Sequence, residues 1–156
     1  MFFFLIKKNN RVNSPIKIWL KEIIIGLNLC PFANKPFEAG QINISNTEKI
    51  DLKEMTEFFL DELQKLNTSK VFTTSLISFS KTNYDFRQFH DFVGHCEDLL
   101  IDLGLEDTYQ LVTFHPDFIF EGVSKDDRVN YVNRSPYPLI HILQAIDVEN
   151  ALRTTE

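Results

Sequence analysis

The chain has 156 residues, 44% of them hydrophobic and 24% charged, as expected of one globular domain that needs no metal or disulfide to fold. Its formal net charge of −6, from 22 acidic and 16 basic residues, argues against a protein that binds nucleic acid by neutralising phosphates. No segment approaches the roughly 20 consecutive apolar residues of a membrane span. Two cysteines without CxxC spacing favour reduced thiols in the cytoplasm.

Helix and strand signals alternate along the chain. Helices are expected where apolar residues recur every three or four positions, and strands where β-branched or alternating apolar residues run together. Helices are predicted over about 15–25, from a capping box at Ser45 and Glu48 to about Leu66, over 85–103, and over 136–146. Strands are predicted over 41–45, 71–79 and 108–114, with a short fourth at 118–120.

This alternation predicts an α/β fold. We expect a frayed extension at residues 1–12 and, over residues 13–156, a compact single-domain α/β sandwich with about four helices. Its small sheet should have three to four strands and be at least partly parallel. Both a two-layer sandwich and a small three-layer sheet satisfy the pattern. Ligands of parallel α/β sheets bind beyond the carboxyl ends of the strands, so the connectors that leave the strands are candidates for a site.

The longer of two polar connectors runs from His115 to Pro138. Connections of this length without structure of their own tend to be functional or disordered. His115 and Asp117 follow the third predicted strand, where an imidazole and a carboxylate could act as a base and its orienter. The alternative is that His115 ends the strand and Asp117 forms a turn.

The end of this connector carries side chains suited to an anion. Arg134 can donate two parallel hydrogen bonds to a carboxylate or phosphate, and Asn133 and Ser135 flank it. Prolines at 136 and 138 lack N–H groups, which leaves Tyr137 as an early backbone donor of the predicted last helix. His141 would lie one turn later, facing solvent or the space beneath the connector. The alternative for Arg134 is a solvated side chain.

The other connector carries Cys30, two residues after Asn28. Cys30 would serve as a nucleophile or redox thiol if His115 or Arg134 lay close enough to stabilise its thiolate. The alternative is a buried cysteine that packs as a small apolar side chain.

Three motifs link the chain to a known family. Gly-Leu-Asn-Leu-Cys-Pro-Phe-Ala covers 26–33 after Trp19, Phe-His-Pro-Asp-Phe covers 114–118, and Asn-Arg-Ser-Pro-Tyr-Pro covers 133–138 before His141. With these motifs in this order, the chain resembles the bacterial and plant domain-of-unknown-function family fourteen-fifteen over nearly its whole length. The resemblance implies no activity.

The resemblance does imply that the two connectors meet, because the family motifs coincide with them. The residues that would then converge are Cys30, His115, Asp117, Asn133 and Arg134. The chain departs from the family pattern at Asn43, near residues 79–80 and at Gln144, so roles at those positions are not transferred.

Three functions remain open. The first is an enzyme or binding protein for an anionic small molecule, with Cys30, His115 and Asp117 as catalytic residues. Its ligand-binding residues would be Asn28, Asn133, Arg134, Ser135, Tyr137 and His141. The second is a metal site of Cys30, His115 and Asp117, and the third is a scaffold whose polar loops are structural. No motif identifies a cofactor or an oligomeric state, and we expect neither a nucleic-acid nor a membrane partner.

Overall fold

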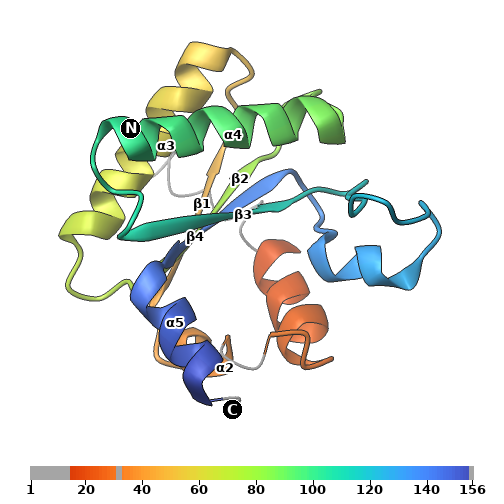
Figure 1. Cartoon of the computed structure of the whole chain (residues 1–156), viewed down its shortest axis with the longest axis horizontal. Coiled ribbons are helices and arrows are strands. Elements are labelled where there is room, and N and C mark those ends of the chain that lie inside the picture. Colours follow the sequence, from red (N-terminus) through yellow and green to blue (C-terminus); the bar gives the residue numbers. More distant parts are fainter. Residues whose placement is uncertain (1–14, 31–32, 155–156) are drawn as a thin grey trace.

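A computed structural model describes residues 15–30 and 33–154, which fold around one mixed sheet of strand order β1-β2-β4-β3 (Figure 1). The strands are β1 (Ile42–Thr47), β2 (Thr74–Phe79), β3 (Tyr109–Phe114) and β4 (Leu139–Gln144). β1 and β2 are parallel, while β4 is antiparallel to both β2 and β3. β1, β2 and β3 therefore share one direction, which confirms the predicted α/β fold with a partly parallel sheet. The extension predicted at 1–12 lies outside the described residues.

Helices cover both faces of the sheet. They are the π-helix η1 (Leu20–Ile25), α2 (Asn34–Glu38), α3 (Leu52–Thr68), α4 (Phe86–Asp102), the 3-10 helix η2 (Arg128–Asn133) and α5 (Ala145–Thr154). α3 and α4 lie on one face, whereas η1, α2 and α5 lie on the other (Figure 1). The arrangement therefore has three layers, with a hydrophobic cluster on each side of the sheet.

The cluster under α3 and α4 is rich in aromatic rings. Phe79 of β2 lies 5.3 Å from Phe92 and 5.6 Å from both Phe58 and Phe89, measured between ring centroids. Full burial of such a side chain contributes roughly 1.5–3 kcal/mol, so this cluster is a main source of stability. It includes Cys96, which is fully buried on this side of the sheet.

The cluster on the opposite face joins η1 to the sheet. Trp19 packs edge-on against Phe114, with their centroids 5.4 Å apart. Successive residues of a strand point to opposite faces. In β4, Ile140 and Ile142 therefore join the α3 and α4 cluster, while Leu139 joins this one.

The prediction of a helix over 136–146 is wrong, because residues 139–144 form β4 and the helix begins at Ala145. Apolar residues at 139, 140, 142 and 143 fit either period, and a strand buried on both faces lacks the alternation that would mark it. β4 occupies the centre of the sheet, where it pairs with both β2 and β3. Residues 118–120 form no strand, which corrects the expected fourth one.

The predicted capping box is also wrong. The side chain of Asp51, rather than Ser45, caps α3 by accepting hydrogen bonds from the backbone N–H groups of Lys53 and Glu54. Ser45 lies inside β1, and its hydroxyl donates to Glu62 of α3 at 2.8 Å. The predictions for α4 and β3 are confirmed to within one residue at each end.

Candidate binding cavity

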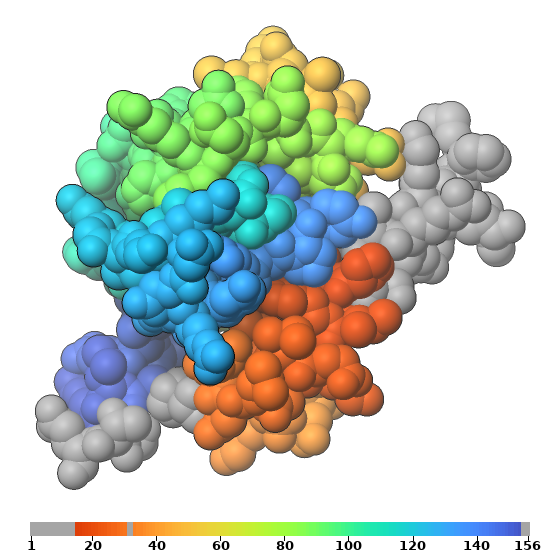
Figure 2. Space-filling view, turned by 90° about the vertical axis from the view of Figure 1, so that its right-hand side faces the viewer, coloured from red at the N-terminus to blue at the C-terminus, as the bar shows by residue number. Residues whose placement is uncertain are grey.

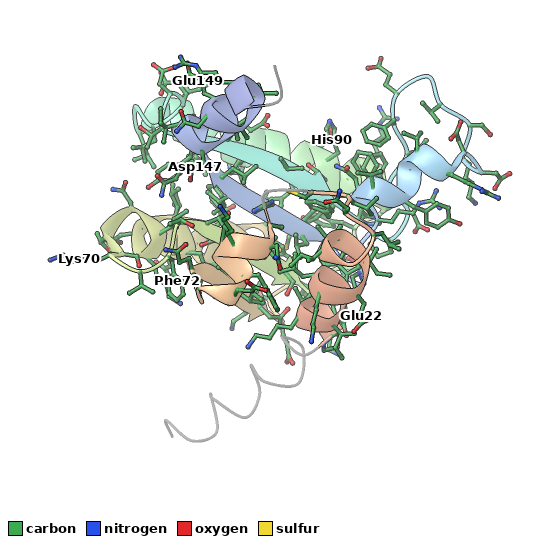
Figure 3. All side chains as sticks on the ribbon, turned by 90° about the horizontal axis from the view of Figure 1, so that it is seen from below. Glu22, Lys70, Phe72, His90, Asp147 and Glu149 are labelled. Atoms are coloured by element: carbon green, nitrogen blue, oxygen red, sulfur yellow. The ribbon has the colours of Figure 1, made fainter. Side chains whose placement is uncertain are left out.

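A cavity of about 880 Å³ lies between the sheet and the layer formed by η1, α2 and α5. Figure 3 looks onto this face, with η1 and α5 on opposite sides of the strands and Asp147 on α5. Most lining residues are apolar, including Leu20, Ile24, Leu76 and Phe114. The polar residues that line it are Cys30, Asn34, Lys35, Gln41, Thr73, Thr74, Asn133, His141 and Asp147. The cavity thus lies over a face of the sheet, rather than beyond the carboxyl ends of the parallel strands.

One wall is a π-helix, which is rare and frequently found at functional sites. The wide turn shows in the hydrogen bond from the N–H of Gly26 to the carbonyl oxygen of Lys21, five residues earlier, at 2.9 Å. A Cβ atom on Gly26 would lie 2.4 Å from the carbonyl oxygen of Glu22, so only glycine fits. Leu20 and Ile24 of this helix both line the cavity.

The floor of the cavity includes His141, which lies in β4 and is half-buried. Its Nε2 lies 2.7 Å from the hydroxyl oxygen of Thr74 in the neighbouring strand β2. The same hydroxyl oxygen lies 2.7 Å from the carbonyl oxygen of Ile142. Burial lowers the pKa of His141 to about 4, so the ring is neutral near pH 7.

The cavity brings together some of the sequence candidates. Cys30 is a free, half-buried thiol and lines it, as does Asn133, whose side-chain amide donates to the carbonyl oxygen of Thr113 at 3.1 Å. The second cysteine, Cys96, is different, because burial raises the pKa of its thiol well above the usual range, with a smaller contribution from Glu97.

His115 lies on the other face of the sheet. Phe114 faces the cavity, so the next residue, His115, turns toward Phe86 and Phe89 of α4, with ring centroids 5.9 and 6.0 Å away. Its Nδ1 accepts the backbone N–H of Asp117 at 3.0 Å, and its Nε2 lies 3.1 Å from the carbonyl oxygen of Tyr84. Both ring nitrogens thus have backbone partners, and the residue is 4% exposed.

Arg134 and Asp117 also lie away from the cavity. The guanidinium of Arg134 donates from Nε to the carbonyl oxygen of Phe118 at 3.1 Å and from Nη2 to that of Lys125 at 2.9 Å. It stacks on the ring of Tyr131, 4.7 Å from the centroid. The side chain of Asp117 is exposed, and no hydrogen bond joins its carboxylate to His115 among the described residues.

The remaining candidates form turns. Asn28 is exposed and has a φ of 52°, a left-handed conformation that asparagine tolerates better than most residues. The hydroxyl of Ser135 donates to the carbonyl oxygen of Tyr137 at 2.6 Å, and the Tyr137 side chain packs against the cluster around Trp19. Of the nine candidate residues, Cys30, Asn133 and His141 therefore line the cavity.

The segment 15–30 lies beside the second connector, as Figure 2 shows where orange atoms lie against the blue segment before β4. Cys30 of the first connector lines the same cavity as Asn133 of the second. A hydrogen bond from Nε1 of Trp19, at the start of η1, to the carbonyl oxygen of Arg134 at 3.1 Å joins the preceding helix to the second connector. The family model for proteins of unknown function named DUF1415 matches residues 11–156, which is nearly the whole chain. The chain belongs to the DUF1415 family. Comparison with curated proteins and with solved structures found no match.

The described residues of this DUF1415 protein contain neither a metal-binding cluster nor a membrane-spanning helix. Among residues 15–30 and 33–154, no three His, Cys, Asp or Glu side chains come together as a metal site would require. Cys30 and His115, two of the three proposed metal ligands, lie on opposite sides of the sheet. In the same residues, no helix is long and apolar enough to cross a membrane.

The sequence did not indicate Thr74, Lys35, Gln41 or Asp147 as lining residues of the DUF1415 cavity. Thr74 belongs to a run that predicts a strand, and nothing in that run indicates that its hydroxyl meets a histidine 67 residues away. Asp147 lies on α5, whose position depends on β4, the element for which a helix was predicted. Correct assignment of β4 would have placed Leu139, His141 and Leu143 on one face of the sheet.

Proposed function

We propose that this DUF1415 protein binds a small, largely apolar molecule in the cavity between the sheet and η1, α2 and α5. The observation that supports this proposal is the cavity itself. Ligand sites are typically concave, mostly apolar spaces of about 300–1,000 Å³ with a few polar groups that orient the ligand. A volume of about 880 Å³ falls in that range, and His141, Thr74 and Asn133 supply polar groups on its surface.

Apolar side chains at the cavity support the same proposal. Leu152 lines the cavity yet is 67% exposed, and Ile24, Leu29 and Leu143 add apolar surface around the same space. Protein interiors are packed about as densely as organic crystals, so a hollow of this size gains contacts when a ligand fills it. An apolar ligand would also remove part of Leu152 from water.

The position of Arg134 argues against the anionic ligand that the sequence suggested. Arg134 does not line the cavity and already has two backbone partners, so it offers little to an anion there. Two free thiols, at Cys30 and Cys96, fit a cytoplasmic protein. We therefore propose a cytoplasmic protein that binds the apolar part of its ligand through the apolar cavity walls. Thr74 and His141 of the sheet would supply the polar contacts.

A thiol-dependent reaction in the same cavity is a second candidate. Cys30 and His141 both line the cavity, which supports the pairing of a thiol with a base. Iodoacetamide should then modify Cys30 in the native protein and Cys96 only after unfolding. A native protein that shows no modification of Cys30 by mass spectrometry removes this candidate and leaves the binding proposal intact.

The binding proposal can be tested with Nile red, a neutral apolar dye whose emission rises in apolar surroundings. Val148 of α5 lines the cavity, so Val148→Phe should fill part of it and weaken dye binding at least severalfold. Val71→Phe is the matched control, because Val71 is 59% exposed and lies outside the cavity. Equal affinity in both variants, or no saturable binding by the wild type, would contradict the proposal.

A further inference from the structure

We propose that Thr74 holds His141 in one tautomer and thereby makes the cavity selective for neutral ligands that donate a hydrogen bond, such as alcohols, phenols and neutral N–H groups. This inference rests on the proposed function and adds the chemistry of the ligand. The inference follows from two protons, the hydroxyl proton of Thr74 and the single N–H proton of the neutral His141 ring.

The Thr74 hydroxyl has one proton and can also accept hydrogen bonds. Its oxygen lies 2.7 Å from the carbonyl oxygen of Ile142, an atom that can only accept. The hydroxyl proton must therefore point to Ile142, since two oxygens at this distance without a proton between them would repel each other. The equally short contact to Nε2 of His141 then requires Nε2 to carry a proton and to donate it.

The other ring nitrogen of His141, Nδ1, is consequently the acceptor. The hydrogen bonds of the described residues give this atom no donor. An Nδ1 atom without a donor could still be enclosed by protein. Among the described residues, however, the only side-chain polar atom that is both buried and without a partner is Ser80 Oγ, so Nδ1 of His141 is not buried. Because His141 lines the cavity and is half-buried, the Nδ1 lone pair is accessible from that space.

A lone pair in a largely apolar space discriminates between ligands. A hydroxyl or N–H group can donate to Nδ1, whereas an ether, ketone or carboxylate would leave Nδ1 unpaired and oppose its lone pair. Protonation of the ring would reverse this preference, but burial lowers the pKa of His141 to about 4. The charged residues that line the cavity, Lys35 and Asp147, are both exposed to solvent.

The test compares three biphenyls by isothermal titration calorimetry near neutral pH. They are 4-phenylphenol, which donates, 4-methoxybiphenyl, which only accepts, and the anion biphenyl-4-carboxylate. We expect the phenol to bind roughly tenfold more tightly than either of the others, as one hydrogen bond to a buried acceptor predicts. In His141→Leu the three affinities should become similar.

The outcomes separate this inference from the proposed function. Equal binding of all three compounds by the wild type would overturn the selectivity and leave the cavity as a binding site. Tighter binding of the carboxylate would overturn it as well. Failure of all three to bind would overturn both proposals.

Thr74 acts here as a positioning residue. Thr74→Val removes the acceptor of the Nε2 proton, so the preference for the phenol should fall, while Thr74→Ser should retain it. Nitrogen NMR of protein labelled at its 4 histidines reads the tautomer directly in the wild type. The signal that is missing from His141→Leu should show a protonated Nε2 and an unprotonated Nδ1. A protonated Nδ1 in the wild type would overturn the inference whatever the variants do.

Discussion

The indole N–H of Trp19, at the start of η1, donates to the carbonyl oxygen of Arg134 at 3.1 Å and thereby joins that helix to the connector before β4, 115 residues away in sequence. Trp19 is also the single tryptophan of the chain, and its ring lines the cavity. The bond therefore couples the wall of the candidate site to the motif before β4.

Trp19→Phe should lower the free energy of unfolding by about 1–3 kcal/mol, because the carbonyl oxygen of Arg134 loses its donor and a cavity opens beside Phe114. Urea denaturation can be monitored by circular dichroism, which does not depend on the tryptophan fluorescence that this substitution removes. The exposed residue Ile18, next to Trp19 in the chain, offers a control, since Ile18→Val should change stability by less than about 0.5 kcal/mol. Equal stabilities would show that the link contributes little.

Arg134→Lys should destabilise the fold by about 1–2 kcal/mol, since an ammonium cannot replace the two-pronged contact with Phe118 and Lys125 or the stacking on Tyr131. Arg128→Lys is the matched control and should have almost no effect, because Arg128 is exposed and has no hydrogen bond among those described. Nile red affinity should be the same in both variants. A large loss of affinity in Arg134→Lys alone would favour a ligand clamp over a structural role.

His115→Phe should cost about 1–3 kcal/mol of stability, because the N–H of Asp117 and the carbonyl oxygen of Tyr84 both lose their partner in a partly buried place. The aromatic packing against Phe86 and Phe89 would survive, so the loss reports the hydrogen bonds. His95→Ala, at an exposed position of α4, serves as the control. If His115→Phe unfolds at the same urea concentration as the wild type, the two hydrogen bonds of the His115 ring do not stabilise the fold.

Gly26→Ala should destabilise the protein by more than about 1 kcal/mol, because its Cβ would lie 2.4 Å from the backbone oxygen of Glu22. Gly94→Ala makes a sharp comparison. Gly94 lies within α4, and a methyl group added there would meet nothing within 4 Å, so this change should stabilise the protein by about 0.5–1 kcal/mol. Thermal unfolding of the two variants should therefore shift in opposite directions, and a shared direction would contradict the account of the π-helix.

The stability of the wild type should fall as the pH drops from 6.5 toward 4, because burial lowers the pKa of His141 from 6.5 to about 4. Between these values the unfolded chain binds a proton at this residue that the folded protein does not, so acid favours unfolding. Each pKa unit corresponds to about 1.4 kcal/mol, and solvent in the cavity screens part of it, which leaves on the order of 1–3 kcal/mol.

The measurement is the difference in unfolding free energy between wild type and His141→Leu at several pH values. This difference should change over that interval and remain constant above pH 6.5. A difference that does not vary with pH would show that His141 titrates normally in the folded protein.

Local patterns were sufficient for much of this fold. Apolar periodicity predicted α3 and α4, because each buries one stripe of side chains against the cluster on its side of the sheet. Runs of β-branched and apolar residues predicted β2 and β3. The same reasoning failed at residues 139–144, where apolar residues on both faces of a central strand match a helix equally well. Of the five residues that the family motifs implied would converge, Cys30 and Asn133 share the cavity, and the other three lie away from it.

The composition of the candidate site could not be predicted in the same way. Cys30, Asn133 and His141 were among the residues proposed, but their cavity also needs Thr74 and α5, and the contact of Thr74 with His141 depends on the pairing of β2 with β4. The alternation of side chains along β3 excluded His115 from the cavity, since Phe114 faces the cavity and the next residue, His115, faces α4. Periodicity along the chain therefore specifies helices, strands and buried stripes, whereas strand pairing determines which polar groups share a space, because it joins residues that are distant in sequence.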